Sequence, residues 1–356
     1  MIEGIIVGSL IIHLSYYVFL FSKMRNGAMS DVNADTSPIS LVVCYRNESK
    51  DLGKTLPFII DQQVDEWILI DDHSEDETYH LLKEFEKENV KVISKQYDSK
   101  GKKGALSVGV NSSTRDRILL TDADCIPASD KWSQRMNMVS KSFVLGYGPM
   151  IKTKGLVNEF SRYETYLAAL QYFSYAIWGK PYMGVGRNLL ISKSELKRGK
   201  DKIRGKQLAS GDDDLMINAL ATKENCGICL DQEAFVYSPS KTTWRTFLNQ
   251  KVRHLSTSFY YKNLHKFLLG VFSGTQILFY SFLFIGLVLG NVSVLSGVVF
   301  LVIKWSIQMI VHRKAMKILK EQDMMYNSIY LDVMMYLYYV TLPIYFGLNK
   351  NRITWK

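Results

Sequence analysis

The stretch Ile39-Ser-Leu-Val-Val-Cys-Tyr-Arg-Asn-Glu48 joins an apolar, β-rich run to a polar end. Residues 67–70, 90–94 and 118–120 repeat this pattern, and polar residues follow each of them. Residues 77–89 carry apolar side chains at helical spacing. Strands that alternate with helices predict an α/β domain with a parallel, doubly wound sheet. Ligands bind at the carboxyl ends of the strands in such sheets, which is where the polar residues lie.

The composition of the whole chain conceals a segregation of charge. The 356 residues are 47% hydrophobic and 22% charged, which are ordinary values for a globular protein. Residues 5–21 nevertheless contain no charged side chain, and Lys304 is the only one in residues 267–311. Few prolines, four cysteines and the lack of a repeat exclude a disordered chain, a collagen and a disulfide scaffold.

Apolar segments predict membrane spans at both ends of the chain. Residues 5–21 are nearly long enough to cross a hydrocarbon core of about 30 Å, and Lys23 and Arg25 follow them. Basic residues collect on the cytoplasmic side, so the N-terminus is expected outside and the next domain in the cytosol. The segment has no basic residue before it, so we expect an uncleaved anchor. Residues 267–289 and 292–311 predict a helical hairpin through the same membrane.

Two features of the C-terminal region leave alternatives open. Lys304 can face neighbouring helices, extend to the membrane surface, or contact a substrate that passes between helices. The last apolar segment, 329–348, contains Asp332 and Pro343. It can span the bilayer, or it can lie at the interface with both ends inside, which the positive-inside rule favours.

The domain organisation follows from these patterns. We expect five segments: an N-terminal transmembrane helix at 1–24, a cytosolic α/β domain at 37–240, an amphipathic interface helix at 241–265, a transmembrane hairpin at 266–312, and a basic cytosolic helix with the final apolar segment at 313–356. The net charge of +10 lies mostly beside the membrane segments. An anionic membrane surface is therefore the expected partner, and nucleic acid is not.

Paired aspartates follow the apolar run at 118–120. Asp122 and Asp124 lie two residues apart, and in an extended chain such side chains project the same way. Carboxylate oxygens suit a hard cation that keeps several waters and bridges a diphosphate, so the pair predicts a Mg²⁺ or Mn²⁺ site. By contrast, the Cys226-Gly-Ile-Cys229 spacing lacks a second ligand pair and does not predict a metal site.

Two further loops offer groups for a nucleotide. A glycine-rich loop around Gly101 contains four lysines, whose ammonium groups suit phosphate oxygens: Lys95, Lys100, Lys102 and Lys103. Asp71 and Asp72 end another apolar run. One of these acids can accept a hydrogen bond from a base or ribose, while the other can cap a turn.

An acidic cluster and an amphipathic helix follow later in the chain. Asp212, Asp213 and Asp214 precede a helix, and mutual repulsion is expected to make one of them a better general base. In residues 241–262 the apolar side chains cover one arc of a helix, with Gln250 and Arg253 roughly opposite. Such a helix can rest on the membrane and hold these two side chains toward the cytosolic domain, with Lys251 extended to the surface.

The ordered set of motifs resembles glycosyltransferase family 2. This family comprises membrane-bound, inverting enzymes with a Rossmann-like GT-A fold, and it includes cellulose, chitin and hyaluronan synthases. The motifs are Val42-Val-Cys-Tyr-Arg-Asn-Glu48, Asp71-Asp-His-Ser74, Gly101-Lys102, Asp122-Ala-Asp124, Gly211-Asp-Asp213 and Gln250-Lys-Val-Arg253-His254. His254 stands where the family has tryptophan, which favours transfer of one or a few sugars over synthesis of a long polymer.

The resemblance implies a role for each matched position. It places Asp213 as the general base beside Asp212, and Asp124 at the metal with Asp122. It also places a nucleotide sugar on a set of matched positions that again includes Asp122. Those donor-binding residues are Cys44, Arg46, Glu48, Asp72, Lys102, Asp122, Gln250 and Arg253.

The predicted function is metal-dependent, inverting transfer of a hexosyl or N-acetylhexosaminyl group. By the resemblance, the donor is a nucleotide diphosphate sugar of the UDP type. The acceptor is a lipid-linked or polymeric glycan at the cytosolic face of the cell (inner) membrane. Two other hypotheses are a non-catalytic membrane protein that binds nucleotide sugars and a structural membrane protein whose acidic loops only cap helices. The resemblance names neither the sugar nor the acceptor.

Overall fold

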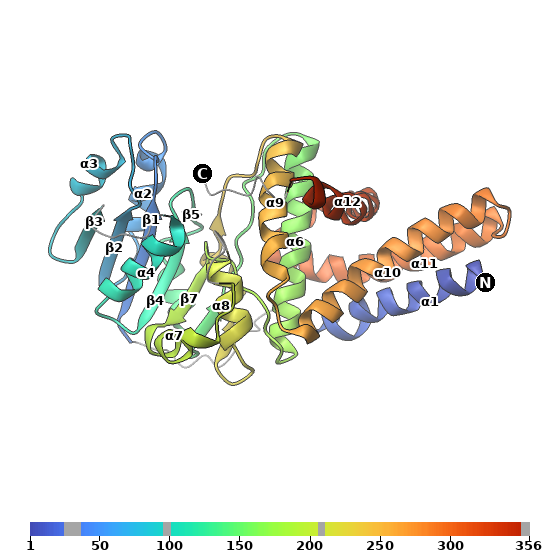
Figure 1. Cartoon of the computed structure of the whole chain (residues 1–356), viewed down its shortest axis with the longest axis horizontal. Coiled ribbons are helices and arrows are strands. Elements are labelled where there is room, and N and C mark those ends of the chain that lie inside the picture. The colour runs from blue at the N-terminus through green and yellow to red at the C-terminus, as the bar shows by residue number, and fades with distance from the viewer. Residues whose placement is uncertain (25–36, 95–100, 206–210, 350–356) are drawn as a thin grey trace. The chain divides into compact units, whose positions relative to one another are not determined.

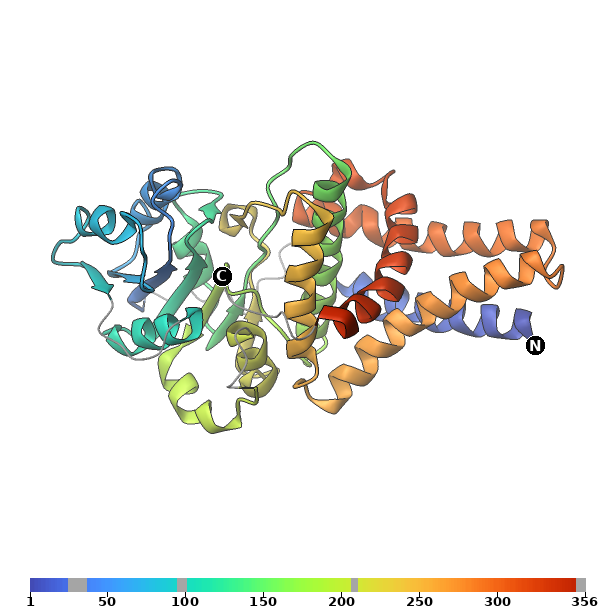
Figure 2. The same ribbon diagram turned by 45° about the horizontal axis from the view of Figure 1, so that its top comes forward.

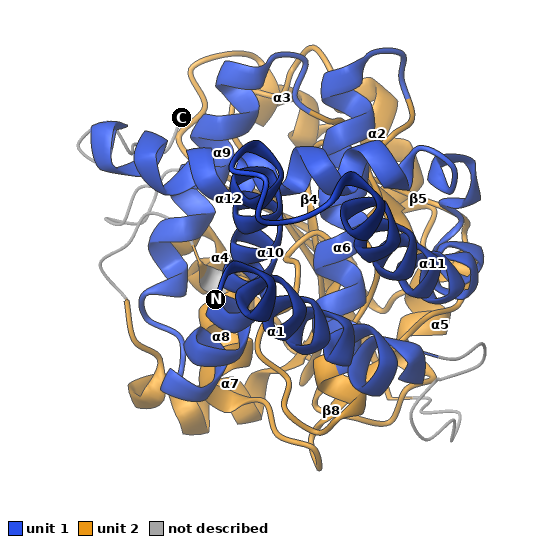
Figure 3. Ribbon diagram, turned by 90° about the vertical axis from the view of Figure 1, so that its right-hand side faces the viewer, with its two compact units in different colours: residues 1–26, 153–174, 241–353 blue, residues 27–152, 175–240, 354–356 orange. Residues whose placement is uncertain are grey.

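The structure is a computed structural model that describes residues 1–24, 37–94, 101–205 and 211–349. It consists of two compact units (Figure 3). The helical unit contains residues 1–26, 153–174 and 241–353. The sheet unit contains residues 27–152, 175–240 and 354–356. Three residues used in the sequence analysis lie outside the described residues: Arg25 after the first apolar segment, and Lys95 and Lys100 in the loop around Gly101.

A seven-stranded sheet forms the centre of the sheet unit, in the order β3-β2-β1-β4-β7-β6-β8 (Figure 1). Its strands are β1 (Ile39–Tyr45), β2 (Glu66–Asp71), β3 (Val90–Ser94), β4 (Arg117–Asp122), β6 (Phe143–Leu145), β7 (Leu189–Ser192) and β8 (Cys226–Ile228). The first four strands are parallel, as the sequence predicts. The mixed α/β architecture with a mostly parallel sheet is that of the GT-A fold.

The apolar strands are buried because helices cover both faces of the sheet. Alternate residues of a strand point to opposite faces, so Leu41 and Val43 join a cluster with α2 (Leu52–Ile60) and α5 (Trp132–Asn137). On the other face α4 (Lys102–Ser112) packs against β1 and β2. Gly109 permits this close approach, since a Cβ there would overlap side chains of β1 and β2.

The sheet departs from a wholly parallel arrangement at β7. This strand pairs antiparallel with both β4 and β6. The chain enters β7 at the edge where β4 ends: Thr121 Oγ1 donates to the carbonyl of Arg187 at 2.9 Å. It leaves at the opposite edge, where the Lys193 N–H donates to the carbonyl of Asp116 at 2.8 Å. The amino end of β7 therefore lies beside the carboxyl end of β4.

Shorter elements complete the sheet unit. They are α3 (Thr78–Lys83), α7 (Lys193–Gly199), α8 (Asp212–Leu220) and a small antiparallel sheet of β5 (Ile126–Pro127) and β9 (Val236–Tyr237). Trp132 at the start of α5 is fully buried, and its ring N–H donates to Asn188 Oδ1 at 2.9 Å. This bond fixes the segment before β7 against the core.

The helical unit consists mainly of long helices. They are α1 (Ile2–Ser15, continued by short turns to Lys23), α6 (Leu156–Ile177, whose last three residues belong to the sheet unit), α9 (Trp244–Ser258), α10 (Asn263–Val288), α11 (Val294–Leu319) and α12 (Ser328–Asn349). Four segments are long and apolar enough to cross a membrane: Ile2–Lys23, Asn263–Val288, Val294–Leu319 and Ser328–Asn349. Large apolar side chains stay exposed at the hairpin between α10 and α11, as in Phe284, Val288 and Leu295.

The last helix differs in direction from the other candidate spans. In Figures 1 and 2, α1, α10 and α11 run alongside one another, whereas α12 runs across α10 and α11. α12 packs on α9, where the Tyr345 hydroxyl donates to Asn249 Oδ1 at 2.8 Å. Its Tyr338 ring also lies 5.7 Å from the Phe160 ring of α6. This direction is what an interfacial segment requires, although the length and composition of α12 also suit a span.

Lys304 contacts neighbouring helices, which was one of the alternatives open from the sequence. Its side chain is fully buried, forms an ion pair with Asp332 of α12, and lies 3.1 Å from Gln308 Oε1. Asp332 also accepts hydrogen bonds from Gln276 at 3.1 Å and from the Tyr280 hydroxyl at 2.5 Å. The charges of Lys304 and Asp332 therefore neutralise each other between α11 and α12.

Candidate active site

The candidate site lies where β1, β2 and β4 end. Cys44 of β1 is paired in register with Ile70 of β2 and with Asp122 of β4. The carboxyl ends of three parallel strands therefore bring their polar residues to one edge of the sheet. Cys44, Arg46 and Glu48 are half-buried at this edge. Their predicted contact with a nucleotide sugar stays a prediction.

The loops after β1 and β2 are tied to each other. The Asn47 N–H donates to Ser74 Oγ at 3.0 Å, and the Glu48 N–H donates to Thr78 Oγ1 at 2.8 Å. Asn47 has a φ of 55°, a left-handed conformation that asparagine tolerates better than most residues. These bonds make one fixed surface from two loops that are separate in the sequence.

Asp71 and Asp72 make different contacts at the end of β2. Asp71 is fully buried, and its Oδ2 accepts the Ser74 N–H at 3.4 Å, so it supports the turn. Asp72 is also buried, and its Oδ1 lies 3.1 Å from the Gly101 N–H, which it accepts, and 3.1 Å from His73 Nδ1. Asp72 therefore fixes the start of the lysine-bearing helix, and its predicted contact with a nucleotide base is not tested.

Lys102 is the first residue of α4, and it connects several predicted site residues. Its ammonium group forms an ion pair with Asp122 at the end of β4. Burial disfavours its charge, but the nearby carboxylates of Asp122 and Asp213 outweigh that effect and raise the pKa of Lys102. The side chain is consequently charged at neutral pH. Lys103, beside it, donates instead to the carbonyl of Gly205 at 3.4 Å.

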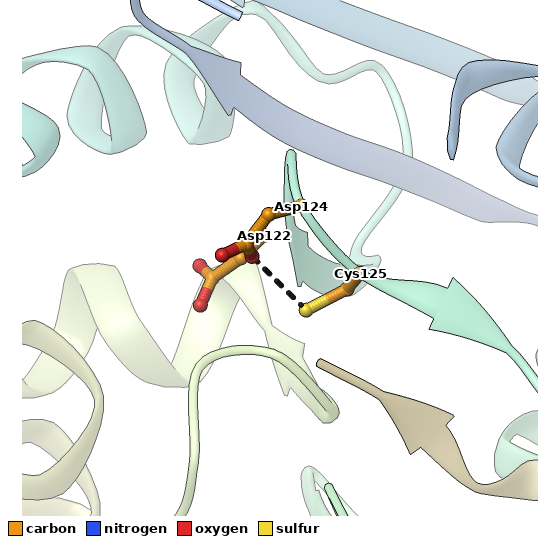
Figure 4. Close-up of side chains that lie close together, drawn as sticks. All are labelled: Asp122, Asp124 and Cys125. Atoms are coloured by element: carbon orange, nitrogen blue, oxygen red, sulfur yellow. Dashed lines mark hydrogen bonds between the residues drawn. The ribbon is translucent and has the colours of Figure 1, made fainter. Parts of the chain in front are cut away.

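Asp122 and Asp124 come together with Cys125 at the end of β4 (Figure 4). One carboxylate oxygen of each acid and the Cys125 sulfur lie within 4.8 Å of one another. The expected geometry of this pair needs correction, because Asp124 follows the strand in a turn rather than in extended chain. The Cys125 N–H donates to the carbonyl of Asp122 at 3.2 Å and closes this turn.

The residues of this cluster fit a hard divalent cation. Burial, together with the carboxylates of Asp122 and Asp124, raises the pKa of the Cys125 thiol well above its usual value. The sulfur therefore keeps its proton, and it lies 3.5 Å from Asp124 Oδ1, to which it donates. Mg²⁺ and Mn²⁺ prefer the carboxylate oxygens of Asp122 and Asp124 over the sulfur of Cys125.

The acidic run forms the first turn of α8, whereas the sequence analysis placed it just before the helix. Gly211 precedes the helix with a φ of 90°, a left-handed conformation that favours glycine. Asp213 in the first turn accepts a hydrogen bond from the backbone N–H of Gly186. Asp214 is buried, and its Oδ1 lies 2.8 Å from the Leu215 nitrogen. The hydrogen bond from Gly186 therefore fixes the carboxylate of Asp213, while the side chain of Asp212 lies outside the described part of the structure.

The segment before β7 is part of the site, and the sequence reasoning missed it. Gly186 contacts Asp213, and Arg187 donates to the carbonyl of Gly148 at 2.9 and 2.6 Å. Asn188 is fully buried and donates to the carbonyls of Tyr147 and Ala234 at 2.7 Å each. The available signal was the polar run Gly-Arg-Asn directly before the apolar residues of β7.

Gln250 and Arg253 belong to the helical unit. They lie half-buried on α9, where Phe247 and Val252 are buried as the predicted apolar arc requires. Lys251 does not extend to the surface, because it forms an ion pair with Glu164 of α6 and its side chain is only 11% exposed. Sequence periodicity could not reveal this partner, which lies 87 residues away. The predicted contact of Gln250 and Arg253 with a donor is not tested.

Comparison with known proteins supports the same fold. Residues 40–189 match the model of the family described as "Glycosyl transferase family 2". The mannosyltransferase PcManGT from Pyrobaculum calidifontis, solved with GDP-Man and Mn²⁺, is 14% identical with a TM-score of 0.64, over 97% of this chain and 98% of that one. S. aureus TarS 1-349 is 15% identical with a TM-score of 0.45, over 84% of this chain and 89% of that one. No curated protein sequence matches the chain.

The matched range contains β1, β2, β3 and β4 together with the Asp122–Cys125 cluster, Lys102 and the Gly186 segment. The similarity to PcManGT shows the GT-A fold and also extends over the terminal helices. Residues 40–189 are thus a glycosyltransferase family 2 domain, as the motifs of the sequence predict.

Proposed function

We propose that the protein is a metal-dependent, inverting glycosyltransferase that uses a nucleotide diphosphate sugar, of the UDP type, as donor. The acceptor is a hydroxyl of a lipid-linked or polymeric glycan at the cytosolic face of the membrane. One observation carries the proposal. Lys102 forms an ion pair with Asp122, the predicted metal ligand, and its charge is also attracted by the carboxylate of Asp213, the predicted base, in the same unit. A base, a cation site and a phosphate-binding ammonium group are what transfer from a diphosphate leaving group needs.

The reaction begins with the acceptor hydroxyl beside Asp213. As its oxygen forms a bond to the anomeric carbon, Asp213 takes the hydroxyl proton. The bond from that carbon to the diphosphate oxygen breaks, and the nucleoside diphosphate leaves with the electron pair. Attack from the side opposite the leaving group inverts the anomeric configuration. The N–H of Gly186 holds the carboxylate in place for this step.

Negative charge grows on the diphosphate as it leaves. Lys102 offers it an ammonium group, and in our proposal Arg253 of α9 adds a second cation. Asp122 and Asp124 would hold a Mg²⁺ or Mn²⁺ ion, which supplies Lewis-acid stabilisation of the diphosphate oxygens when bound. Asp72 in turn holds the Gly101 backbone and so the start of α4.

The experiment is a nucleotide-release assay with the full-length protein in detergent. A panel of UDP-sugars, with GDP-mannose added because PcManGT was solved with it, is offered with Mg²⁺, Mn²⁺ or a chelator. We expect one sugar class to give metal-dependent release. Asp213→Asn should lower the rate by about 10² to 10⁴, because general-base assistance is typically of that size.

The same variant separates catalysis from binding. Donor affinity of Asp213→Asn, measured by calorimetry, should stay near that of the wild type. A large loss of donor affinity would instead make Asp213 a binding or structural residue. If the wild type bound donors but turned over none of them even with membrane extract as acceptor, the chain would be a nucleotide-sugar-binding protein and not an enzyme.

A further inference from the structure

A cationic side chain already occupies the carboxylate that the proposed metal needs. The ammonium group of Lys102 pairs with Oδ1 of Asp122, and Asp122 contributes an oxygen to the Asp122–Asp124–Cys125 cluster. The side chains of Lys102 and Asp122 are 27% and 32% exposed, so water screens this pair only in part. Lys102 is therefore the counter-ion of the Asp122 carboxylate.

The surroundings of Lys102 hold it there while the site is without a diphosphate. The ion pair with Asp122 keeps its ammonium group at the end of β4. Its backbone is fixed as well, since the N–H of Gly101 just before it donates to Asp72. The side chain can move, but the base of the side chain stays at the start of α4.

A divalent cation and Lys102 compete for Asp122. Like charges a few ångströms apart repel each other, and the oxygen that Lys102 contacts cannot at the same time coordinate a metal at full strength. The diphosphate of a donor offers Lys102 another anionic partner, because ammonium groups bind phosphate oxygens well. Arrival of the diphosphate would therefore release Asp122.

We propose that Lys102 is a placeholder for the divalent cation at Asp122, so that the cation and the nucleotide diphosphate enter the site together. This inference rests on the proposed function, since it takes the donor to carry a diphosphate. The inference adds that Lys102 weakens metal binding when no diphosphate is bound and strengthens metal binding when a diphosphate is bound. The protein then avoids holding a metal when no donor is present.

The test is a Mn²⁺ titration of the full-length protein in detergent, with free Mn²⁺ followed by electron paramagnetic resonance. Titrations are run with no nucleotide, with UDP and with GDP. The wild type should bind Mn²⁺ at least about tenfold more tightly with the nucleotide of its donor. Lys102→Met should bind Mn²⁺ about tenfold more tightly than the wild type without nucleotide, and nucleotide should then tighten it by less than about threefold.

Two variants serve as controls. Lys103→Met removes the same charge from the neighbouring position, whose side chain contacts the Gly205 carbonyl, and should leave the nucleotide-free Mn²⁺ affinity unchanged. Lys102→Arg keeps the charge and should keep most of the dependence on nucleotide. An equal rise in affinity for Lys103→Met would overturn the proposal, since net charge would then explain the effect.

Other results also decide the matter. Nucleotide-free Mn²⁺ affinity of Lys102→Met equal to or weaker than that of the wild type would overturn the placeholder role, as would the absence of Mn²⁺ binding in every titration. Sugar transfer by the wild type without nucleotide-dependent Mn²⁺ binding would refute this inference alone. Nucleotide-dependent Mn²⁺ binding with the predicted Lys102→Met effect, but without sugar transfer, would refute the proposed function alone.

Discussion

The orientation of Asp213 depends on a residue without a side chain. A Cβ built on Gly186 would lie 3.0 Å from Asp213 Oδ2, closer than nine in ten such contacts in proteins. Gly186→Ala should therefore displace the carboxylate from the Gly186 N–H. We expect kcat to fall by about tenfold, corresponding to roughly 1.4 kcal/mol, while donor affinity changes less than about twofold.

Gly53→Ala is the matched control for this substitution. Gly53 lies in α2, and a Cβ there would meet no atom within 4 Å. Its kcat and donor affinity should equal those of the wild type. If Gly186→Ala lowered donor affinity as much as kcat, the segment before β7 would shape the donor pocket rather than position the base.

The hydrogen bonds of Asp76 between the loops after β1 and β2 make the stability of the fold depend on pH. Partial burial works against the charge of Asp76, but hydrogen bonds from Ser49 and Thr78 outweigh it and lower the pKa of Asp76 to about 2. The usual value for an unfolded chain is about 3.8. The charged group therefore stabilises the fold above pH 3.8, and this contribution is lost as the pH falls toward 2.

Asp76→Asn should reveal this contribution. We expect the free energy of unfolding to drop by about 1 kcal/mol at pH 6, which for a domain of this size lowers Tm by about 2–4 °C. At pH 3 the difference from the wild type should be clearly smaller. Thermal unfolding followed by tryptophan fluorescence measures both, with the exposed Asp61→Asn as a control that shifts little. A difference that grew as the pH fell would contradict the assignment.

The contact between α11 and α12 contains a desolvated ion pair, Lys304–Asp332. Removing one partner of a buried pair leaves the other charge without compensation, which typically costs about 3–5 kcal/mol. Lys304→Met should therefore lower the thermal stability of the detergent-solubilised protein strongly. Lys304→Met combined with Asp332→Leu should recover most of the loss, because no charge is then left buried.

Lys314→Met is the control for the Lys304 experiment. Lys314 is exposed on the same helix, and its loss should change stability by no more than about 0.5 kcal/mol. Heating followed by size-exclusion chromatography gives the comparison. If Lys304→Met behaved like Lys314→Met, the packing of α12 on α9 and α6 would hold this helix without the ion pair.

The elements that the sequence predicts well are those governed by local pattern. The apolar runs at 39–45 and 90–94 have the same bounds as the strands β1 and β3. The parallel order of the strands follows from the helices between them. The direction of β7 was not predictable, because it depends on where the chain re-enters the sheet after α6. The partners of Lys251 and Lys304 were hidden for the same reason, since Glu164 and Asp332 lie far from them in the sequence.

In the candidate site too, local sequence motifs predicted which residues belong to the sheet domain, but they did not predict the contacts between distant residues. The motifs predict that Lys102, Asp122 and Asp213 lie in one sheet domain, and the structure brings them together. The pairing of Lys102 with Asp122 was not expected, because both were assigned to a donor and its metal. The proton on Cys125 also depends on its burial, which no spacing of cysteines reveals.

The direction of α12 determines on which side of the membrane the C-terminus lies. Three spans, α1, α10 and α11, leave the C-terminus on the side opposite the N-terminus, whereas a fourth span would return it. Because α12 runs across α10 and α11, we expect three spans with the C-terminus in the cytosol (Figure 2). The exposed basic residues Arg313 and Lys314 near the end of α11 agree with a cytosolic position.

Reporter fusions in a bacterial host test this topology. A fluorescent protein fused after Lys356 should fluoresce, and alkaline phosphatase at the same position should be inactive, because the enzyme needs export to fold. Fusion after Asn291, in the turn between α10 and α11, should give the reverse result. Active phosphatase after Lys356 would mean that α12 crosses the bilayer. The Lys304–Asp332 pair would then lie between two antiparallel spans, where it would be the contact that permits an aspartate to enter the hydrocarbon core.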